Sequence, residues 1–313
     1  MATLVTGISG GLAQRVAQTL MNDGEHVVGV DYRRVEGIAE QMPGLSTYRA
    51  SYVKTAIEDV FRRHDITAIL HLGRVGNLSE DKEKRFELNV LGSQKLMSLA
   101  IQHGVTKMVV LSTFHIYGAH PRNHVPISEE DPLRAGPDFP EIADAIQLDN
   151  MATTWVYKHP AVRTIVLRPT NVIGPNIHNT MSKFLRLRRI PTPTGYNPMS
   201  QFVHEEDLAR AIVVARRRDA RGVFNVAGPA VLPWRKAIEL AGARSVSVPS
   251  SLLRAYVRNF SAFPEYLVNF FKYPCVISDA CFRAELDWAP EIDIKETIAS
   301  TVRGFAPRAR ASA

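Results

Sequence analysis

The segment from Thr3 to Asp31 constrains the fold more than any other part of the chain. It contains, in order, a short apolar strand, a glycine-rich turn, a helix and a second strand that ends in an acid. The helix repeats apolar residues along one face, at Leu12, Val16 and Leu20. This order is typical of a dinucleotide-binding unit, in which the turn holds a pyrophosphate at the helix N-terminus. The chain is therefore predicted to begin as a Rossmann fold.

Individual residues of this unit have predicted roles toward a dinucleotide. Gly7 lets the backbone leave the strand sharply, and Gly10 lets it approach a phosphate without a Cβ in the way. Asp31 is predicted to bind the adenosine ribose, and its charge would repel the 2′-phosphate of NADP. The pattern thus favours NAD over NADP, although Arg33 and Arg34 could turn toward such a phosphate. The alternative interpretation is an ordinary strand-to-helix turn of the same composition.

Composition sets broad limits on the class of protein. With 313 residues, of which 45% are hydrophobic, the chain can bury a large core. No segment has the apolar length of a membrane span, and the first residues lack the pattern of a secretory signal, so a cytoplasmic location is the expectation. Cys275 and Cys281 have no histidine at metal-ligand spacing around them and are expected to be ordinary thiols.

Strand and helix patterns continue to alternate well beyond the first unit, which predicts an α/β fold with a doubly wound parallel sheet. The expected strands are residues 68–72, 108–111, 164–167 and 222–227, and the expected helices are 53–63, 86–103 and 206–215. We expect residues 1–175 and 199–230 to form the dinucleotide-binding domain. Residues 176–198 and 231–313 are expected to form a smaller domain on the substrate side.

The formal charge of +7 comes from clustered basic residues. One cluster closes an expected helix, where cations favour the carbonyl end of the helix dipole: Arg216, Arg217, Arg218 and Arg221. The other precedes a proline-rich loop: Lys183, Arg186, Arg188 and Arg189. Neither accompanies a nucleic-acid-binding motif, so no nucleic-acid partner is expected, and a basic scaffold for RNA or anionic membrane is the remote alternative.

Residues 251–273 are unusually rich in aromatic side chains, namely Tyr256, Phe260, Phe263, Tyr266, Phe270 and Phe271. Leu252, Tyr256 and Phe260 share one helical face. Packing into the core is the favoured interpretation. A hydrophobic ligand wall and a membrane-facing patch are the alternatives.

Seven segments together resemble the extended short-chain dehydrogenases/reductases, the group of nucleotide-sugar epimerases and dehydratases. They are TGISGGLA (6–13), ILHLG (69–73), NVLGS (89–93), LSTFHIYG (111–118), RPTNVIGP (168–175), QFVHEEDLARAI (201–212) and the closing ELDWAPEIDIKETI. Within this family, the chain looks most like a bacterial subgroup labelled as UDP-glucose 4-epimerases. The resemblance implies a nucleotide sugar or a related small molecule as ligand, and a homodimer formed through two helices.

The resemblance also implies which residues surround the cofactor and the reacting atoms. Thr113 matches the family's Ser or Thr that binds the reacting oxygen, and Asn89 matches an Asn that is often a fourth member of the site. The predicted cofactor-binding residues are Gly7, Ser9, Gly10, Gly11, Leu12, Asp31, Arg33, Leu72, Gly73, Asn89, Thr113, Arg168, Pro169 and Asn171.

The chain departs from the family at the two residues that transfer the proton. The family has a Tyr and, four residues later, a Lys on one helical face, followed by an acid that Asp149 matches. Counting back places Glu141 at the Tyr position and Ala145 at the Lys position, and there is no Lys between Lys107 and Lys158. A solvated carboxylate is a poor base toward an alcohol, so the chain is predicted to lack normal epimerase or dehydrogenase activity.

Two classes of function stay open. In the first, the protein is a ligand-sensing or regulatory pseudoenzyme that signals to a protein partner. In the second, it is an enzyme that uses Thr113 with Glu141 or His115. Glu141 is otherwise expected to be a solvent-facing or helix-start acid, as is Asp144, and His71 and His204 are expected to be packed histidines.

A second departure concerns the substrate side. Ser200 stands where family members commonly have an Arg that binds the diphosphate. The predicted substrate residues are Lys183, Arg186, Arg189 and Gln201, with a solvated basic face as the alternative for the three cations.

Overall fold

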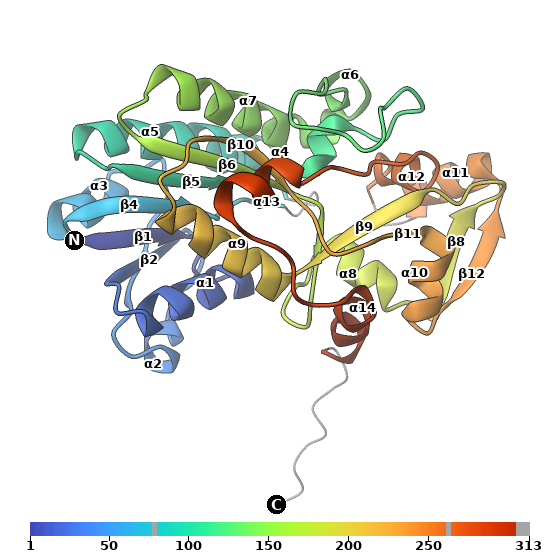
Figure 1. The fold of residues 1–313 in the computed structure, drawn as a ribbon, viewed down its shortest axis with the longest axis horizontal. Coiled ribbons are helices and arrows are strands. Elements are labelled where there is room, and N and C mark those ends of the chain that lie inside the picture. The colour runs from blue at the N-terminus through green and yellow to red at the C-terminus, as the bar shows by residue number, and fades with distance from the viewer. Residues whose placement is uncertain (77–79, 261–263, 305–313) are drawn as a thin grey trace, which may run out of the picture.

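A parallel sheet of seven strands forms the centre of the protein (Figure 1). The computed structural model describes residues 1–76, 80–260 and 264–304. The strands are β1 (Ala2–Thr6), β2 (Val27–Asp31), β3 (Ser46–Arg49), β4 (Ile66–His71), β5 (Lys107–Leu111), β6 (Arg163–Pro169) and β10 (Gly222–Val226). They lie in the order β10-β6-β5-β4-β1-β2-β3, and neighbouring strands are parallel. The order reverses between β1 and β4, where open sheets of this kind bind ligands at the carboxyl ends of the strands.

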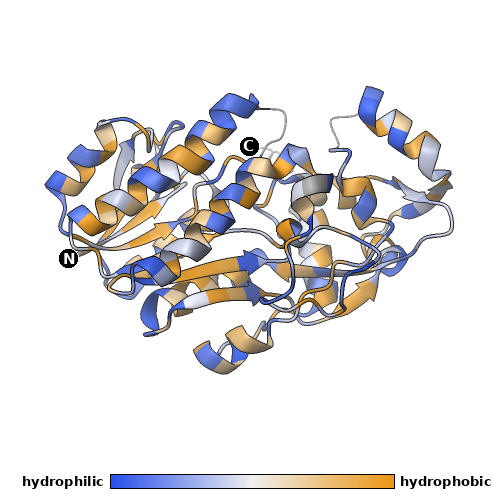
Figure 2. Ribbon diagram, turned by 90° about the horizontal axis from the view of Figure 1, so that it is seen from above, coloured by the Kyte–Doolittle hydropathy of each residue, from blue (hydrophilic) through white to orange (hydrophobic). Residues whose placement is uncertain are grey.

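Helices cover both faces of this sheet and create two separate cores. One face packs against α1 (Gly11–Asn22), α9 (Glu205–Arg217) and α13 (Ala280–Leu286). The other packs against α3 (Ala56–Arg63), α5 (Gly92–Gln102) and α7 (Ala143–Lys158). In Figure 2 the strands are orange between helices with blue outer faces. Successive strand residues point to opposite faces, and both faces are buried, so the strands are continuous apolar runs.

Two smaller sheets lie beyond the carboxyl ends of the large sheet (Figure 1). One has the order β11-β9-β7, from β7 (Asn171–Ile173), β9 (Met199–His204) and β11 (Val231–Pro233). The other pairs β8 (Arg189–Pro193) with β12 (Arg244–Val248). The helices around them are α8 (Thr180–Leu185), α10 (Trp234–Leu240), α11 (Ser250–Phe260), α12 (Leu267–Phe270) and α14 (Ile294–Arg303).

The remaining short elements connect these layers. They are α2 (Ile38–Gln41), α4 (Lys82–Phe86), the π-helix η1 (Glu87–Leu91), the 3-10 helices η2 (Phe114–Tyr117) and η3 (Pro140–Ile142), and α6 (Ala135–Asp138). The chain crosses from β10 to the small β11-β9-β7 sheet at Gly228. A Cβ on Gly228 would lie 1.7 Å from the carbonyl oxygen of Phe202, so no other residue fits at this crossing.

The predicted α/β class and doubly wound parallel sheet are confirmed. The expected strands correspond to β4, β5, β6 and β10, with those over 68–72 and 222–227 each extending one residue beyond the observed strand, and α9 ends in the basic cluster at Arg217, as predicted. The single helix expected over 86–103 was wrong in detail, because η1 interrupts it between α4 and α5. The helix expected from residue 53 begins at Ala56.

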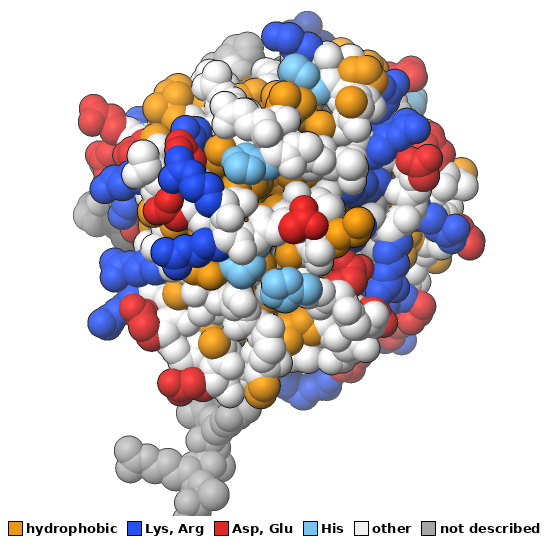
Figure 3. All heavy atoms as spheres, turned by 90° about the vertical axis from the view of Figure 1, so that its left-hand side faces the viewer, with side chains coloured by type: hydrophobic (Ala, Val, Ile, Leu, Met, Phe, Trp, Pro, Cys, Tyr) orange, Lys and Arg blue, Asp and Glu red, His pale blue; other side chains and the backbone are white. Residues whose placement is uncertain are grey.

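Charge and apolar surface are distributed without a dominant patch on the face that Figure 3 shows, at the amino ends of the strands. Lys and Arg side chains are interspersed there with Asp and Glu. No helix among the described residues has both the length and the apolar character needed to cross a membrane. In the aromatic segment, Tyr266, Phe270 and Phe271 are buried, as the core interpretation predicts. That interpretation was wrong for the helical face that carries Leu252 and Tyr256, because both side chains are exposed. Phe263 and the side chain of Phe260 lie outside the described residues.

Candidate functional site

The glycine turn lies at the point where the strand order reverses. Gly7 follows β1 with a φ of +77°, and a Cβ on it would lie 2.6 Å from Cα of Gly73, which follows β4. Only a residue without a side chain fits this close approach of two backbones. Gly10 is the N-cap of α1, where no side chain caps the helix and the first turn contains no acid. The first N–H groups of α1 are therefore available to an anion.

Asp31 ends β2 beside this turn and is buried. Its Oδ2 accepts hydrogen bonds from the backbone N–H of Ser9 at 3.1 Å and from the Ser9 hydroxyl at 2.6 Å. Its Oδ1 accepts the backbone N–H of Arg33 at 2.9 Å. Because a carboxylate offers about four lone-pair positions, these three donors leave room for another. Asp31 thus shapes the turn while keeping the capacity to accept from a hydroxyl.

The other predicted cofactor residues lie along the same edge of the sheet. Ser9 and Leu12 lie in the turn and the first turn of α1, Leu72 and Gly73 follow β4, and Pro169 ends β6. A Cβ on Gly11 would lie 3.1 Å from Cβ of Asn176, so this glycine is also closely packed. The structure therefore brings residues that are distant in sequence to one crevice.

Arg168 and Asn171 have structural partners within this region. Arg168 forms a two-point ion pair with Asp149, with Nε to Oδ1 at 3.0 Å and Nη2 to Oδ2 at 2.6 Å. Both side chains are almost completely buried, and Ser112 donates a further hydrogen bond to Asp149 at 2.6 Å. The Asn171 amide donates to the carbonyl oxygen of Gln201 at 3.0 Å. Arg168 and Asn171 thus stabilise the segments on which other predicted cofactor residues lie.

A chain of hydrogen bonds passes through His71 beneath the crevice. The Thr6 hydroxyl accepts the N–H groups of Leu72 and Gly73, so its own proton is directed to Nδ1 of His71 at 2.8 Å. Nε2 of His71 lies 2.7 Å from the Ser93 hydroxyl, which donates to the carbonyl oxygen of Asn89. His71 is therefore a neutral, packed histidine, as predicted, and burial lowers its pKa to about 4.

Acid is expected to destabilise the protein through His71. Its pKa of about 4 in the folded state lies below the value of 6.5 in the unfolded state, so its contribution is complete above pH 6.5 and is lost as the pH falls toward 4. Between pH 7 and 4.5, urea unfolding should show that wild type loses about 2 to 3 kcal/mol more of its free energy of unfolding than His71→Gln does. Equal losses in the two proteins would contradict this assignment.

The predicted catalytic positions lie around the start of α7. Thr113 is buried and caps η2 by accepting the N–H of His115. Ala145 is buried in α7, whereas Glu141 lies in η3 directly before that helix, so the two positions do not share one helix in this chain. One carboxylate oxygen of Glu141, Oε2, is buried and has no hydrogen-bond partner among the described residues.

Asp144 begins α7 as a helix-start acid but does not face solvent, which corrects that part of the expectation. Its side chain forms an ion pair with Arg85 of α4, and both groups are buried. Asn89 donates to Asp144 at 2.5 Å and also pairs with both the N–H and the carbonyl group of Val75. Arg85 further donates to the backbone carbonyl of Glu141 at 2.8 Å. This buried group of polar side chains fixes the backbone at Glu141.

Tyr266 is a residue of this site that sequence reasoning did not assign to it. Its hydroxyl lies 3.2 Å from Nδ1 of His115, although the two are 151 residues apart in the chain. Arg74, Glu141 and Asp144 interact electrostatically with the Tyr266 phenol, and burial raises its pKa above the usual value. A phenol whose pKa is raised stays protonated at pH 7, so the Tyr266 hydroxyl can donate a hydrogen bond.

A small cavity lies next to His115 on the side of the β11-β9-β7 sheet. Its volume is about 10 Å³, and it is lined by Phe114, His115, Asn171, Met181, Met199, Ser200, Gln201, Trp234, Leu267, Phe270 and Cys275. Of the predicted substrate residues, Gln201 lies here, whereas Lys183, Arg186 and Arg189 do not line the cavity. Lys183 and Arg189 are exposed, and the Arg186 side chain donates to the carbonyl oxygen of Thr301 at 2.9 Å.

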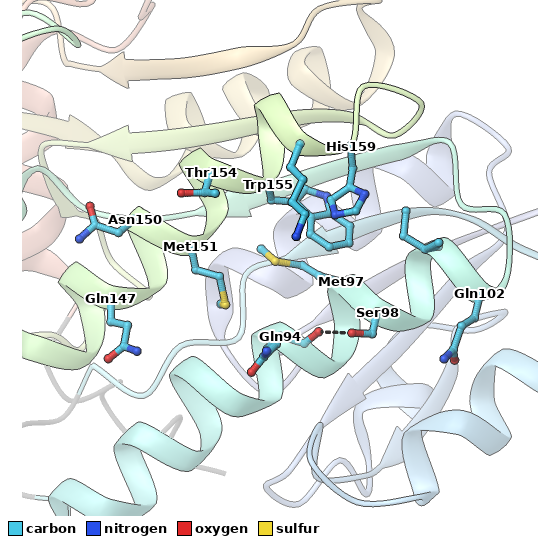
Figure 4. Close-up of a pocket in the computed structure, with 12 residues that line it drawn as sticks. Gln94, Met97, Ser98, Gln102, Gln147, Asn150, Met151, Thr154, Trp155 and His159 are labelled. Carbon is cyan, nitrogen blue, oxygen red and sulfur yellow. Dashed lines mark hydrogen bonds between the residues drawn. The ribbon is translucent and has the colours of Figure 1, made fainter.

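A larger groove of about 720 Å³ runs between the outer faces of α5 and α7, far from the glycine turn in the fold (Figures 1 and 4). Met97 and Met151 lie at its floor, and the Trp155 and His159 rings stack with centroids 3.9 Å apart. Nε1 of Trp155 is buried and has no acceptor among the described residues. The groove thus has four apolar residues among a mostly polar lining, and it is distinct from the edge of the sheet at the glycine turn.

The sequence and fold were compared with known proteins. The chain is 27% identical to the uncharacterized protein Rv0501 of Mycobacterium tuberculosis over 96% of this chain and 83% of that protein. It is 25% identical to dTDP-glucose 4,6-dehydratase of Streptomyces griseus over 96% of this chain and 93% of that enzyme. The structure of UDP-glucose 4-epimerase from Thermus thermophilus, a complex with NAD, has the same fold, with a TM-score of 0.78 at 23% identity, covering 99% of this chain and 100% of that one.

The comparison with family profiles covers most of the chain. The profile of the NAD dependent epimerase/dehydratase family matches residues 3–227, which include the glycine turn, the seven strands of the large sheet and the Glu141 region. We conclude that the chain belongs to the NAD dependent epimerase/dehydratase family.

Proposed function

We propose that the protein binds NAD and a small-molecule ligand in the manner of its family but lacks normal epimerase or dehydrogenase activity, and that it acts as a ligand sensor toward a protein partner. The observation that carries this proposal is the contrast between the two halves of the site. The glycine turn has a close-packed cradle that only glycine fits. By contrast, the residues that the family resemblance places at the lysine and tyrosine positions are the buried Ala145 and the carboxylate of Glu141.

The residues present fit a dinucleotide. The uncapped start of α1 would take the pyrophosphate, and the remaining acceptor capacity of Asp31 suits a ribose hydroxyl. The nicotinamide would supply hydride chemistry when bound. We infer that NAD is preferred to NADP, because a 2′-phosphate would lie beside the Asp31 carboxylate.

In this proposal, the chain lacks the tyrosine and the lysine that transfer the proton in the family. The cations that interact with the site around Tyr266 are Arg74 and Arg85, and Arg85 is already paired with Asp144. Guanidinium groups stay protonated and cannot exchange a proton with a substrate hydroxyl. General acid–base catalysis typically contributes about a hundred- to ten-thousand-fold in rate, so its loss would suppress alcohol and ketone chemistry by that order.

In the second candidate function, the protein is an enzyme with altered catalytic residues. Two buried polar atoms without a partner among the described residues favour this alternative. Oε2 of Glu141 and Nε2 of His115 are both buried and have no partner among the described residues, so either could meet a substrate hydroxyl. In this alternative, Thr113 would bind the reacting oxygen, and Glu141 or His115 would hold the proton.

Turnover and cofactor binding distinguish the two candidates. With NAD and UDP-glucose, we expect neither UDP-galactose by chromatography nor reduced nicotinamide by absorbance above the level of Glu141→Gln. Calorimetry should show binding of NAD, weaker binding of NADP, and a loss of about tenfold for NAD in Asp31→Ala. Robust turnover that Glu141→Gln abolishes would replace the proposal with the enzyme alternative. Failure of wild type to bind either nucleotide would exclude both.

We further propose that the protein is a homodimer through the groove between α5 and α7. Met97, Met151 and Trp155 form an apolar floor, and Ile101 is 46% exposed at its edge. Two copies facing each other would bury Ile101 and the exposed parts of Met151 and Trp155, because a twofold axis places the same two helices on both sides of the interface.

Ile101→Lys is expected to make the protein monomeric, since it places an unpaired ammonium group within that interface at a position that is exposed in a single copy. Light scattering after gel filtration measures the mass directly. Leu252→Lys is the matched control, because Leu252 is 62% exposed on α11, outside the groove, and its replacement should leave the mass unchanged. A wild-type monomer, or an Ile101→Lys dimer, would contradict this interface.

A further inference from the structure

The cavity beside His115 differs chemically from a nucleotide-sugar site, and we propose that it receives an apolar alcohol or ketone whose single oxygen accepts a hydrogen bond from Nε2 of His115. This inference rests on the proposed function, because it specifies the small molecule that the same site binds. It replaces the nucleotide sugar that the family resemblance implies.

Among the described residues, no cation lines the cavity itself, although Arg74 interacts electrostatically with His115 and Tyr266 beside it. None of the described residues that line it is Lys or Arg, and Ser200 lies where the resemblance places an arginine. Arg186, the half-buried member of the nearby basic cluster, is directed to the carbonyl oxygen of Thr301. Burying an ionised group without a compensating charge costs far more than an apolar group gains, so this lining disfavours a nucleotide diphosphate.

The polar side chains of the lining are mostly committed to the protein itself. Gln201 exchanges two hydrogen bonds with the backbone of Ile277, at 3.0 and 2.9 Å. Ser200 donates to the carbonyl oxygen of Leu232 at 2.9 Å, and the Asn171 amide donates to the carbonyl oxygen of Gln201. The remaining lining consists of aromatic, Met, Leu and Cys side chains. A ligand would therefore meet an apolar wall.

His115 is the exception, because Nε2 is buried and has no partner among the described residues. The Tyr266 hydroxyl makes its one described hydrogen bond to Nδ1 of His115, and a buried hydroxyl is satisfied there only by donating. This places the histidine proton on Nε2. Burial also lowers the pKa of His115 to about 3, so the ring stays neutral at pH 7 and Nε2–H is a donor without a positive charge.

The cavity volume of about 10 Å³ holds little more than one water molecule, so a ligand must displace side chains. Met181 and Met199 are suited to this, because their unbranched chains repack at low cost. An apolar ligand would exchange contacts with methionine for similar contacts, whereas a sugar would bring several hydroxyl groups to a wall that offers them no partners.

The test uses the methyl groups of the methionines as reporters. The chain has eight methionines; Met181 and Met199 line this cavity, and Met97 and Met151 line the α5–α7 groove and serve as internal controls. The full-length protein, labelled in its methionine methyl groups and saturated with NAD, is titrated by NMR with cyclohexanone, with methylenecyclohexane and with UDP-glucose. Methylenecyclohexane has the shape of the ketone but lacks its oxygen.

We expect cyclohexanone to shift the Met181 and Met199 signals with about tenfold higher affinity than methylenecyclohexane, and UDP-glucose to leave both signals unchanged. In His115→Phe, which keeps an aromatic ring in the same packing, the difference between the ketone and the hydrocarbon should disappear. Tyr266→Phe should reduce that difference while the ring packing is kept, and nitrogen shifts of His115 should show that its proton is no longer confined to Nε2.

Three results would overturn the inference: a shift of Met181 and Met199 by UDP-glucose, equal affinities for cyclohexanone and methylenecyclohexane in wild type, or no shift with cyclohexanone at millimolar concentration. NAD calorimetry on the same samples separates this failure from failure of the proposed function. A protein that binds NAD but not cyclohexanone would refute the ligand class alone.

Discussion

Replacing Asp149 by Asn is expected to lower the free energy of unfolding by about 3 to 5 kcal/mol, because it leaves the Arg168 cation buried without its counter-charge. Asn has nearly the shape of Asp, so the change tests the charge rather than the packing. The paired side chains are 4% and 0% exposed, and water cannot replace the lost partner. Urea unfolding followed by circular dichroism at pH 7 measures the loss.

The same strand provides the control. Arg163, at the start of β6, pairs with Asp219 at 3.1 Å, and these side chains are 50% and 78% exposed. Asp219→Asn should therefore cost less than about 1 kcal/mol. If Asp149→Asn were no more costly than Asp219→Asn, the buried pair would not be a determinant of stability.

Replacing Gly7 by Ala should both destabilise the protein and abolish detectable NAD binding. The new Cβ would lie 2.6 Å from Cα and 2.8 Å from the backbone nitrogen of Gly73, and the residue has a φ of +77°. The positive φ costs about 1 kcal/mol for alanine, and the crowding of two backbones adds about 1 to 3 kcal/mol. Relief of that contact must displace the turn that leads into α1, so calorimetry should show no heat of NAD binding.

Gly24 separates the two causes. It has a φ of +82° after the end of α1, but nothing lies within 4 Å of a Cβ placed there. Gly24→Ala should therefore lose only the conformational part, about 1 kcal/mol, and keep NAD binding. Equal behaviour of Gly7→Ala and Gly24→Ala would show that the close approach of β1 and β4 is not required.

The large sheet could be predicted from the sequence because its signals are local. A parallel strand buried on both faces gives an unbroken apolar run, and the cationic end of α9 follows from the helix dipole. The π-helix η1 has no such local signal: residues 86–103 keep a helical pattern, and only the packing of Asn89 against Val75 and Asp144 shows why the helix is interrupted there.

The chemistry of the site could be predicted only in part. The positions of Glu141 and Ala145 follow from a family resemblance along the chain, but the contact between His115 and Tyr266 joins segments 151 residues apart. Arg85 and Asp144 likewise meet from different helices. No periodicity or spacing relates such residues, because their approach depends on how separate segments of the chain pack together. The burial of Asp144 against Arg85 and Asn89 likewise has no local signal in the sequence.

The crossing at Gly228 has a consequence for how a ligand enters. A Cβ on Gly228 would lie 1.7 Å from the Phe202 carbonyl oxygen. The backbone that follows the large sheet is therefore in direct contact with β9 at this point, and no space separates them. Leu267 and Phe270 of the short helix α12 line the cavity. We therefore expect the cavity to widen by movement of α12 and not by separation of the large sheet from β9. The rate of ligand entry would then be set by the motion of α12, while the cofactor cradle stays still.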